Sequence, residues 1–123
     1  MKVYSNAKLK LLMFTYELAR CLQGTGITVN AVLPGFVATN LGKNSGSRRQ
    51  ALMFKMVRPF QISAKKAAQI PIYLATSKET EGLTGKCYSK LREITTSHSS
   101  YDQALQKRLW NETQTILGLS TEI

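Results

Sequence analysis

Two residues near the start of the chain, Tyr4 and Lys8, have the types and the spacing for acid–base chemistry. In a helix, residues four apart lie one above the other, so a phenol and an ammonium would be neighbours. A free phenol titrates near 10, but a cation at about 6 Å favours the phenolate by roughly 2–3 kcal/mol at an effective dielectric constant near 20. Such a pair can act as a general acid–base. A buried tyrosine above a solvated lysine has the same spacing, so the surrounding sequence must distinguish the two.

The elements around this pair are expected in the order helix, turn, strand. Helical spacing of apolar residues predicts a helix from Tyr4 to about Leu22, and Gly24 suits its C-terminal end. The predicted apolar stripe consists of Tyr4, Ala7, Leu11, Phe14, Leu18 and Cys21. Residues 27–33 are mostly β-branched or apolar without alternation, which is typical of a parallel strand buried on both faces.

The second half of the chain predicts two further helices and another strand. One helix is expected over residues 63–77 with Ser63 as its N-cap, and a short strand over residues 85–88. Ser100 and Gln103 have the spacing of a capping box, which predicts a terminal helix after them.

The order of these motifs resembles one family. Tyr-Ser-Asn-Ala-Lys-Leu from Tyr4 and Val-Asn-Ala-Val-Leu-Pro-Gly from Val29 are similar to the C-terminal half of a short-chain dehydrogenase/reductase, most of all its retinol-dehydrogenase-like branch. The resemblance implies an α/β fold, namely the C-terminal part of a Rossmann-like doubly wound parallel sheet without the N-terminal nucleotide-binding strands. Residues 1–123 are then expected to form a single partial domain, namely the half of the short-chain dehydrogenase fold that contains the catalytic helix and the substrate-binding side.

The resemblance also implies roles for particular residues. Tyr4 would be the catalytic acid–base, assisted by Lys8. Cofactor-binding residues would be Lys8, Pro34, Gly35, Val37 and Thr39, at or beyond a strand's carboxyl end, where open α/β sheets bind ligands. The substrate pocket would be lined by Phe54, Met56 and Phe60. Two simpler interpretations are equally good. Thr39 would then be an ordinary turn hydroxyl, and the apolar residues near 51–57 would belong to a short helix that packs in the usual way.

The implied reaction is hydride transfer between NAD or NADP and a small apolar alcohol, aldehyde or ketone, with retinoid-like substrates. Two features of the family have no counterpart here: a strand followed by G-x-x-x-G-x-G, and the serine on the strand before the tyrosine helix. We therefore expect a truncated form that is inactive alone, binds cofactor poorly and associates through the helix at residues 4–22. The alternative is a non-catalytic interaction module in which this helix pairs with a full-length subunit or another partner.

The formal net charge of +10 is compatible with a third class of function, electrostatic binding to an anionic partner. The basic residues are spread along the chain without interleaved aromatics, so we expect no nucleic-acid partner. Cys21 and Cys87 are interpreted as buried thiols, and no metal-ligand pattern is present. Charged residues interrupt the apolar run at residues 9–22, which predicts no membrane span. The resemblance implies a cytoplasmic or membrane-associated location for a full-length parent.

Overall fold

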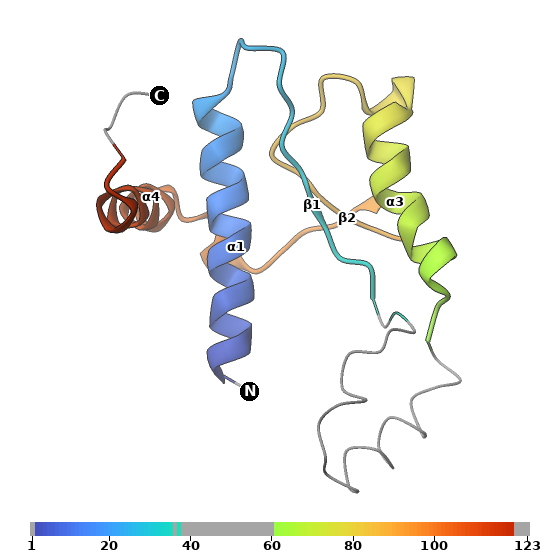
Figure 1. Ribbon diagram of the computed structural model, residues 1–123, viewed down its shortest axis with the longest axis horizontal. Coiled ribbons are helices and arrows are strands. Elements are labelled where there is room, and N and C mark those ends of the chain that lie inside the picture. The colour runs from blue at the N-terminus through green and yellow to red at the C-terminus, as the bar shows by residue number, and fades with distance from the viewer. Residues whose placement is uncertain (1, 36, 38–60, 120–123) are drawn as a thin grey trace, which may run out of the picture.

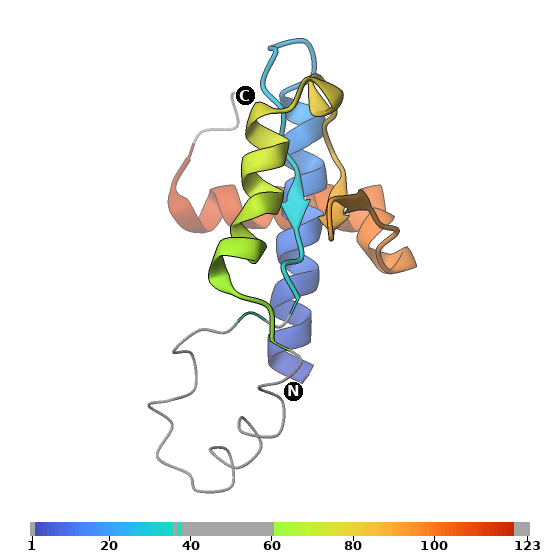
Figure 2. The same cartoon turned by 90° about the vertical axis from the view of Figure 1, so that its right-hand side faces the viewer.

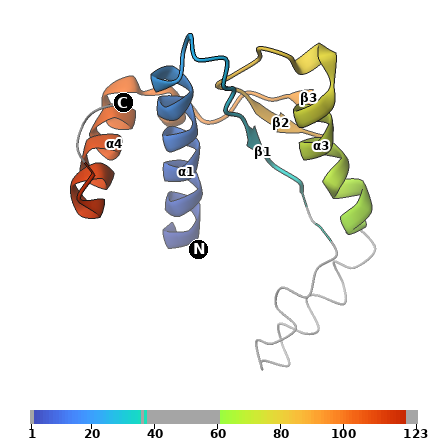
Figure 3. The same cartoon turned by 45° about the horizontal axis from the view of Figure 1, so that its top comes forward.

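The computed structural model of the protein describes residues 2–35, 37 and 61–119. The α-helices are α1 (Lys2–Cys21), α3 (Ala64–Thr76) and α4 (Gln103–Leu117), and the strands are β1 (Ala31–Val32), β2 (Cys87–Ser89) and β3 (Arg92–Glu93). Two short 3₁₀ helices complete the described elements, η2 (Lys78–Thr80) and η3 (His98–Tyr101). The strands lie between α1 and α3, and α4 lies on the other side of α1 (Figures 1 and 3).

The sheet of the described residues has the order β1-β2-β3. β1 pairs with β2 in parallel, with Ala31 opposite Cys87 and Val32 opposite Tyr88. Gly85 N–H donates to the Val29 carbonyl and Leu33 N–H to the Tyr88 carbonyl, both at 2.8 Å, so the pairing extends beyond the two residues of β1. The α/β class and the parallel pairing expected from the sequence are confirmed.

The antiparallel strand β3 was not expected from the sequence. It pairs with β2 through a tight turn in which Lys90 and Leu91 have φ of 50° and 60°. Two-residue hairpin turns favour positive φ, and Asn-Gly is their usual sequence signal. Lys-Leu gives no such signal, so the sequence concealed both the hairpin and the mixed character of the sheet.

Burial along α1 differs from the predicted stripe. The buried residues are Met13, Thr15, Tyr16, Glu17 and Ala19, all in the C-terminal half. Tyr4 and Leu11, two members of the predicted stripe, are 70% and 57% exposed. In the described part of the chain, η3 and α4 pack against the buried half of the helix. A Cβ at Gly85 would lie 3.5 Å from the Ala19 Cβ. The segment that leads into β2 therefore also packs close to the C-terminal half of α1.

The predicted N-cap of α3 is confirmed, because the Ser63 hydroxyl accepts a hydrogen bond from Lys66 N–H at 3.2 Å. The predicted capping box at Ser100 and Gln103 is wrong. Asp102 caps α4 instead, with its carboxylate accepting from Leu105 N–H at 3.1 Å. An aspartate is an equally good N-cap, and using it leaves the serine hydroxyl for another role.

That role is in a buried polar network. The Ser100 hydroxyl donates to the Ser97 carbonyl at 2.6 Å and shares a hydrogen bond of 2.6 Å with the Thr96 hydroxyl. The Thr96 hydroxyl in turn shares one of 2.9 Å with the Tyr16 hydroxyl. This chain of hydroxyls joins the segment before α4 to the middle of α1. Burial raises the pKa of Tyr16 to about 12.

The helix α4 is fixed to α1 by aromatic and polar contacts. The Phe14 and Trp110 rings stack with centroids 5.0 Å apart. Gln106 is only 2% exposed; it accepts from the Arg20 guanidinium at 2.6 Å and donates to the Ser100 carbonyl at 2.5 Å. Arg20 is also paired with Glu17. Both partners of the buried amide are therefore supplied by neighbouring elements, as its burial requires.

Of the two predicted buried thiols, Cys87 is buried and Cys21 is half-buried, and both are free. Burial raises the pKa of the Cys87 thiol. Within residues 2–35 and 61–119, no helix combines the length and the apolar character needed to cross a bilayer.

Candidate active site

Tyr4 and Lys8 lie on one face of the first turns of α1. The Lys8 Nζ is 5.4 Å from the centroid of the Tyr4 ring, a distance at which an ammonium is attracted by the negative face of an aromatic ring. Both side chains are exposed, and Tyr4 retains 70% of its accessible surface. The i, i+4 spacing alone accounts for this proximity, because such residues are neighbours on a helix. The pair is thus assembled by one helix and open to a ligand.

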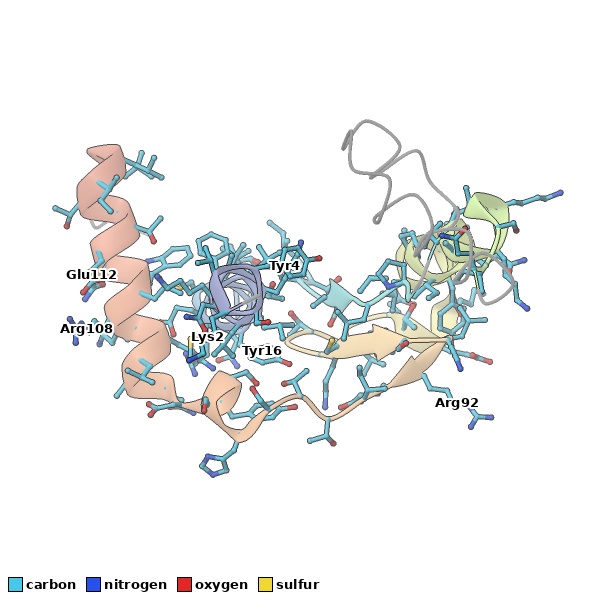
Figure 4. The ribbon with its side chains drawn as sticks, turned by 90° about the horizontal axis from the view of Figure 1, so that it is seen from below. Lys2, Tyr4, Tyr16, Arg92, Arg108 and Glu112 are labelled. Carbon is cyan, nitrogen blue, oxygen red and sulfur yellow. The ribbon has the colours of Figure 1, made fainter. Side chains whose placement is uncertain are left out.

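β1 and α1 run in opposite directions, and β1 lies beside the middle of α1 (Figures 1 and 2). The chain that leaves the carboxyl end of β1 continues toward the end of the molecule where α1 starts. Figure 4, seen from this end, places Tyr4 on the side of α1 that faces β1. A ligand beyond the carboxyl end of the strand would therefore lie on the tyrosine side of the helix.

Gly35 and Val37, two of the predicted cofactor residues, follow β1 in the chain. Gly35 has φ of 78°, a conformation that favours glycine, and among the described residues, its chain neighbours aside, no atom lies within 4 Å of the position that a Cβ would occupy. Val37 forms an isolated parallel bridge with Ile62, which ties this segment to the residues just before α3. Pro34 and Gly35 are both exposed.

The other predicted site residues, Thr39, Phe54, Met56 and Phe60, lie outside the described residues, as does the helix expected at 51–57. The structure therefore brings together Tyr4 and Lys8, and directs the chain that follows β1 toward the same end of α1. The catalytic, cofactor and substrate roles assigned from the sequence remain predictions.

Sequence reasoning gave no role to Asn30, which positions β1. Its side-chain amide donates to the Leu83 carbonyl at 2.8 Å, and its amide oxygen accepts from Lys86 N–H at 3.0 Å. These bonds fasten the start of β1 to the segment leading into β2. An asparagine within an apolar strand was the available signal, since a half-buried amide there needs partners.

The described residues offer an acid–base pair rather than a metal centre or a phosphate cradle. Among residues 2–35, 37 and 61–119, no three His, Cys, Asp or Glu side chains gather as metal ligands. The glycine turn at 24–26 joins a helix to a strand, which is the reverse of the strand-to-helix order of a dinucleotide-binding turn. What this surface brings together is an exposed phenol and an exposed ammonium, with Lys8 Nζ 5.4 Å from the Tyr4 ring centroid.

Residues 1–89 match the family model described as enoyl-(acyl carrier protein) reductase. Among curated proteins, the chain is 39% identical over 121 residues to retinol dehydrogenase 13 of Mus musculus, covering 95% of this chain and 36% of that protein. It is 35% identical over 119 residues to retinol dehydrogenase 12 of Mus musculus, and the match covers 97% of this chain and 37% of that protein. It is 36% identical over 118 residues to retinol dehydrogenase 14 of Homo sapiens, and the match covers 94% of this chain and 35% of that protein. The chain thus spans a little over a third of the length of these relatives.

Proposed function

Because the chain belongs to the short-chain dehydrogenase/reductase family, in its retinol-dehydrogenase-like part, we propose that Tyr4 is the general acid–base of a hydride transfer assisted by Lys8. The substrate class is an apolar alcohol, aldehyde or ketone. The observation that carries this proposal is the distance of 5.4 Å from the Lys8 ammonium to the ring centroid of Tyr4. Tyr4 lies on the side of α1 that faces β1 (Figure 4).

The proton transfer follows from this pair. In the reducing direction, the Tyr4 hydroxyl donates its proton to the carbonyl oxygen while hydride adds to the carbonyl carbon, which gives an alcohol. In the oxidising direction, the phenolate accepts the alcohol proton as hydride leaves the carbon. Lys8 assists by stabilising the phenolate electrostatically. Members of the family use NAD or NADP, which supplies or accepts the hydride when bound.

The residues around β1 fit the nicotinamide end of such a cofactor. Lys8 would hydrogen-bond the nicotinamide ribose, and the exposed backbone after β1 would contact the ring, with Pro34, Gly35, Val37 and Thr39 contributing. Gly35 supports this assignment, because a backbone without a Cβ can be approached closely.

The relatives' names indicate the substrate class. Three of them are retinol dehydrogenases, and retinol is an apolar alcohol. We assign a retinoid-like or comparable apolar substrate to this site, lined by Phe54, Met56 and Phe60.

By itself, the 123-residue chain is expected to be inactive. Its sequence has no G-x-x-x-G-x-G turn to hold the pyrophosphate, and cofactor orientation is what creates a reactive geometry. Titrating the purified chain with NADH or NADPH and following cofactor fluorescence tests this. No saturation is expected in the micromolar range, and clear saturation there would contradict it.

The experiment for the function itself uses a chimera. Residues 1–123 replace the matched segment of mouse retinol dehydrogenase 13, and reduction of an apolar aldehyde is followed through loss of NADPH or NADH absorbance. A folded chimera that turns over supports the proposal. A chimera that folds and binds cofactor but does not turn over contradicts it.

A second candidate function is an interaction module. Val3, Tyr4 and Leu11 of α1 are 84%, 70% and 57% exposed, which leaves apolar surface on this helix for a partner. Sedimentation of the chain with and without an intact relative distinguishes the two functions, because a module forms a stable complex and a catalytic segment alone does not.

A further inference from the structure

A groove of about 270 Å³ lies between α1 and α4, and neither Tyr4 nor Lys8 lines it. Its lining residues come from two helices: Asn6, Leu9, Lys10 and Met13 of α1, and Leu105, Arg108, Leu109 and Glu112 of α4. The stacked Phe14 and Trp110 rings hold the two helices together beside it. The proposed hydride-transfer site does not use this groove.

The groove has an apolar lining of four side chains, Leu9, Met13, Leu105 and Leu109. Met13 is almost fully buried at 6%, whereas Leu105 is 45% exposed, so the groove is deep on the α1 side and open beside α4. Its volume lies just below the roughly 300–1,000 Å³ of pockets for drug-sized ligands. It therefore suits a single short hydrocarbon chain rather than a protein helix, which is about 10 Å in diameter.

The polar rim of the groove carries one net positive charge. The Arg108 guanidinium donates to the Glu112 carboxylate at 2.8 Å, so these two charges neutralise each other. Figure 4 places this pair on the side of α4 away from α1, which makes it the outer rim. Lys10, from α1, has no hydrogen bond or ion pair among the described residues, and Asn6 adds an amide one turn earlier. A single anionic group is the complement of this rim.

We propose that the groove binds a single-chain amphiphile with one anionic head group, of which a medium-chain carboxylate is the simplest example. The hydrocarbon chain would lie on the four apolar side chains, and the carboxylate would pair with Lys10. A neutral chain would leave that ammonium unmatched. A second copy of this chain would bring its own formal net charge of +10 against the same rim.

Trp110 provides a built-in reporter of occupancy. It is the one tryptophan of the sequence, and it stacks on Phe14. Leu109 and Met13 are the chain neighbours of these two aromatic residues and line the groove. A ligand on the apolar lining therefore changes the surroundings of the indole and its fluorescence.

The test titrates the full 123-residue chain with decanoate, below the concentration at which it forms micelles, and follows Trp110 fluorescence. Decanol is the matched neutral ligand. We expect saturable binding of decanoate, up to about fivefold tighter than decanol, since an exposed ion pair contributes up to about 1 kcal/mol. Lys10→Gln should weaken decanoate binding by a similar factor and leave decanol unaffected.

Two further variants keep the result interpretable. Leu105→Glu places a carboxylate at the open side of the groove and should abolish decanoate binding. It occupies the third position of α4, where a glutamate favours the helix, so α4 should still form. Lys107→Gln, on the same helix but outside the groove, is the control and should bind like the parent. Equal affinity for decanoate and decanol, an unchanged Lys10→Gln variant, or no saturation at all would each overturn the proposal.

Discussion

The Lys8 ammonium lies 5.4 Å from the centroid of the Tyr4 ring, one helical turn along α1. Because both residues belong to a single helix, their proximity requires no tertiary contact. Their position relative to β1 does require the rest of the described fold. The residues that dock α4 and the sheet on the other half of α1 therefore decide whether the pair is correctly positioned, and several predictions concern them.

The stability of the fold should depend on the ionisation of Tyr16. Burial raises its pKa from 10.0 to about 12, so the folded state favours the neutral phenol. Its stabilising contribution is complete below pH 10 and is lost as the pH rises from 10 to about 12. Hydrogen bonding to Thr96 lowers the pKa of the stacked Tyr101, which offsets part of this loss.

The measurement compares the parent with Tyr16→Phe in urea unfolding at several pH values. The free energy of unfolding of the parent should fall by on the order of 2 kcal/mol more than that of Tyr16→Phe between pH 9 and pH 12. The same two proteins between pH 7 and pH 9 are the control and should show parallel behaviour. Equal falls at high pH would contradict the role of this phenol.

The aromatic stack between α1 and α4 should contribute measurably to stability. Phe14→Ala removes the ring that stacks on Trp110 at 5.0 Å, and the free energy of unfolding should fall by about 2 kcal/mol or more. Circular dichroism is the suitable probe, because the substitution itself alters the fluorescence of the indole. Val3→Ala, at a position 84% exposed, should change stability by no more than about 0.5 kcal/mol.

The buried side-chain amide of Gln106 should contribute substantially to the free energy of unfolding. Gln106→Leu leaves the Ser100 carbonyl without its donor and removes one acceptor of Arg20, so the loss should be about 2–3 kcal/mol. Gln103→Leu, at an exposed position of the same helix, is the matched control. A Gln106→Leu variant as stable as its control would show that the network is not structurally important.

Local signals in the sequence predicted the elements that are specified locally. Ser63 caps α3, as predicted. The Tyr4–Lys8 proximity also follows from spacing alone. Each of these features depends on a few consecutive residues, and such features are the most readable in a sequence.

Features that depend on tertiary contacts were not predicted. The buried amide of Gln106 bonds Arg20, and the Thr96 hydroxyl bonds Tyr16, so both polar groups have partners that are distant in the sequence. The exposure of Leu11 shows the reverse case, since an apolar position was expected to be covered and no described element covers it. Burial is set by what packs on a helix, and periodicity alone does not give that.

The most direct test of the central claim measures kcat for aldehyde reduction in the chimera with mouse retinol dehydrogenase 13 after single substitutions at the acid–base pair. Tyr4→Phe should lower kcat by about 10²-fold or more, the usual contribution of a general acid, with the cofactor Kd unchanged. Lys8→Gln should lower kcat and weaken cofactor binding, whereas Tyr73→Phe and Lys66→Gln on α3 should leave both near the parent values. A folded Tyr4→Phe chimera with the parent's kcat would contradict the account.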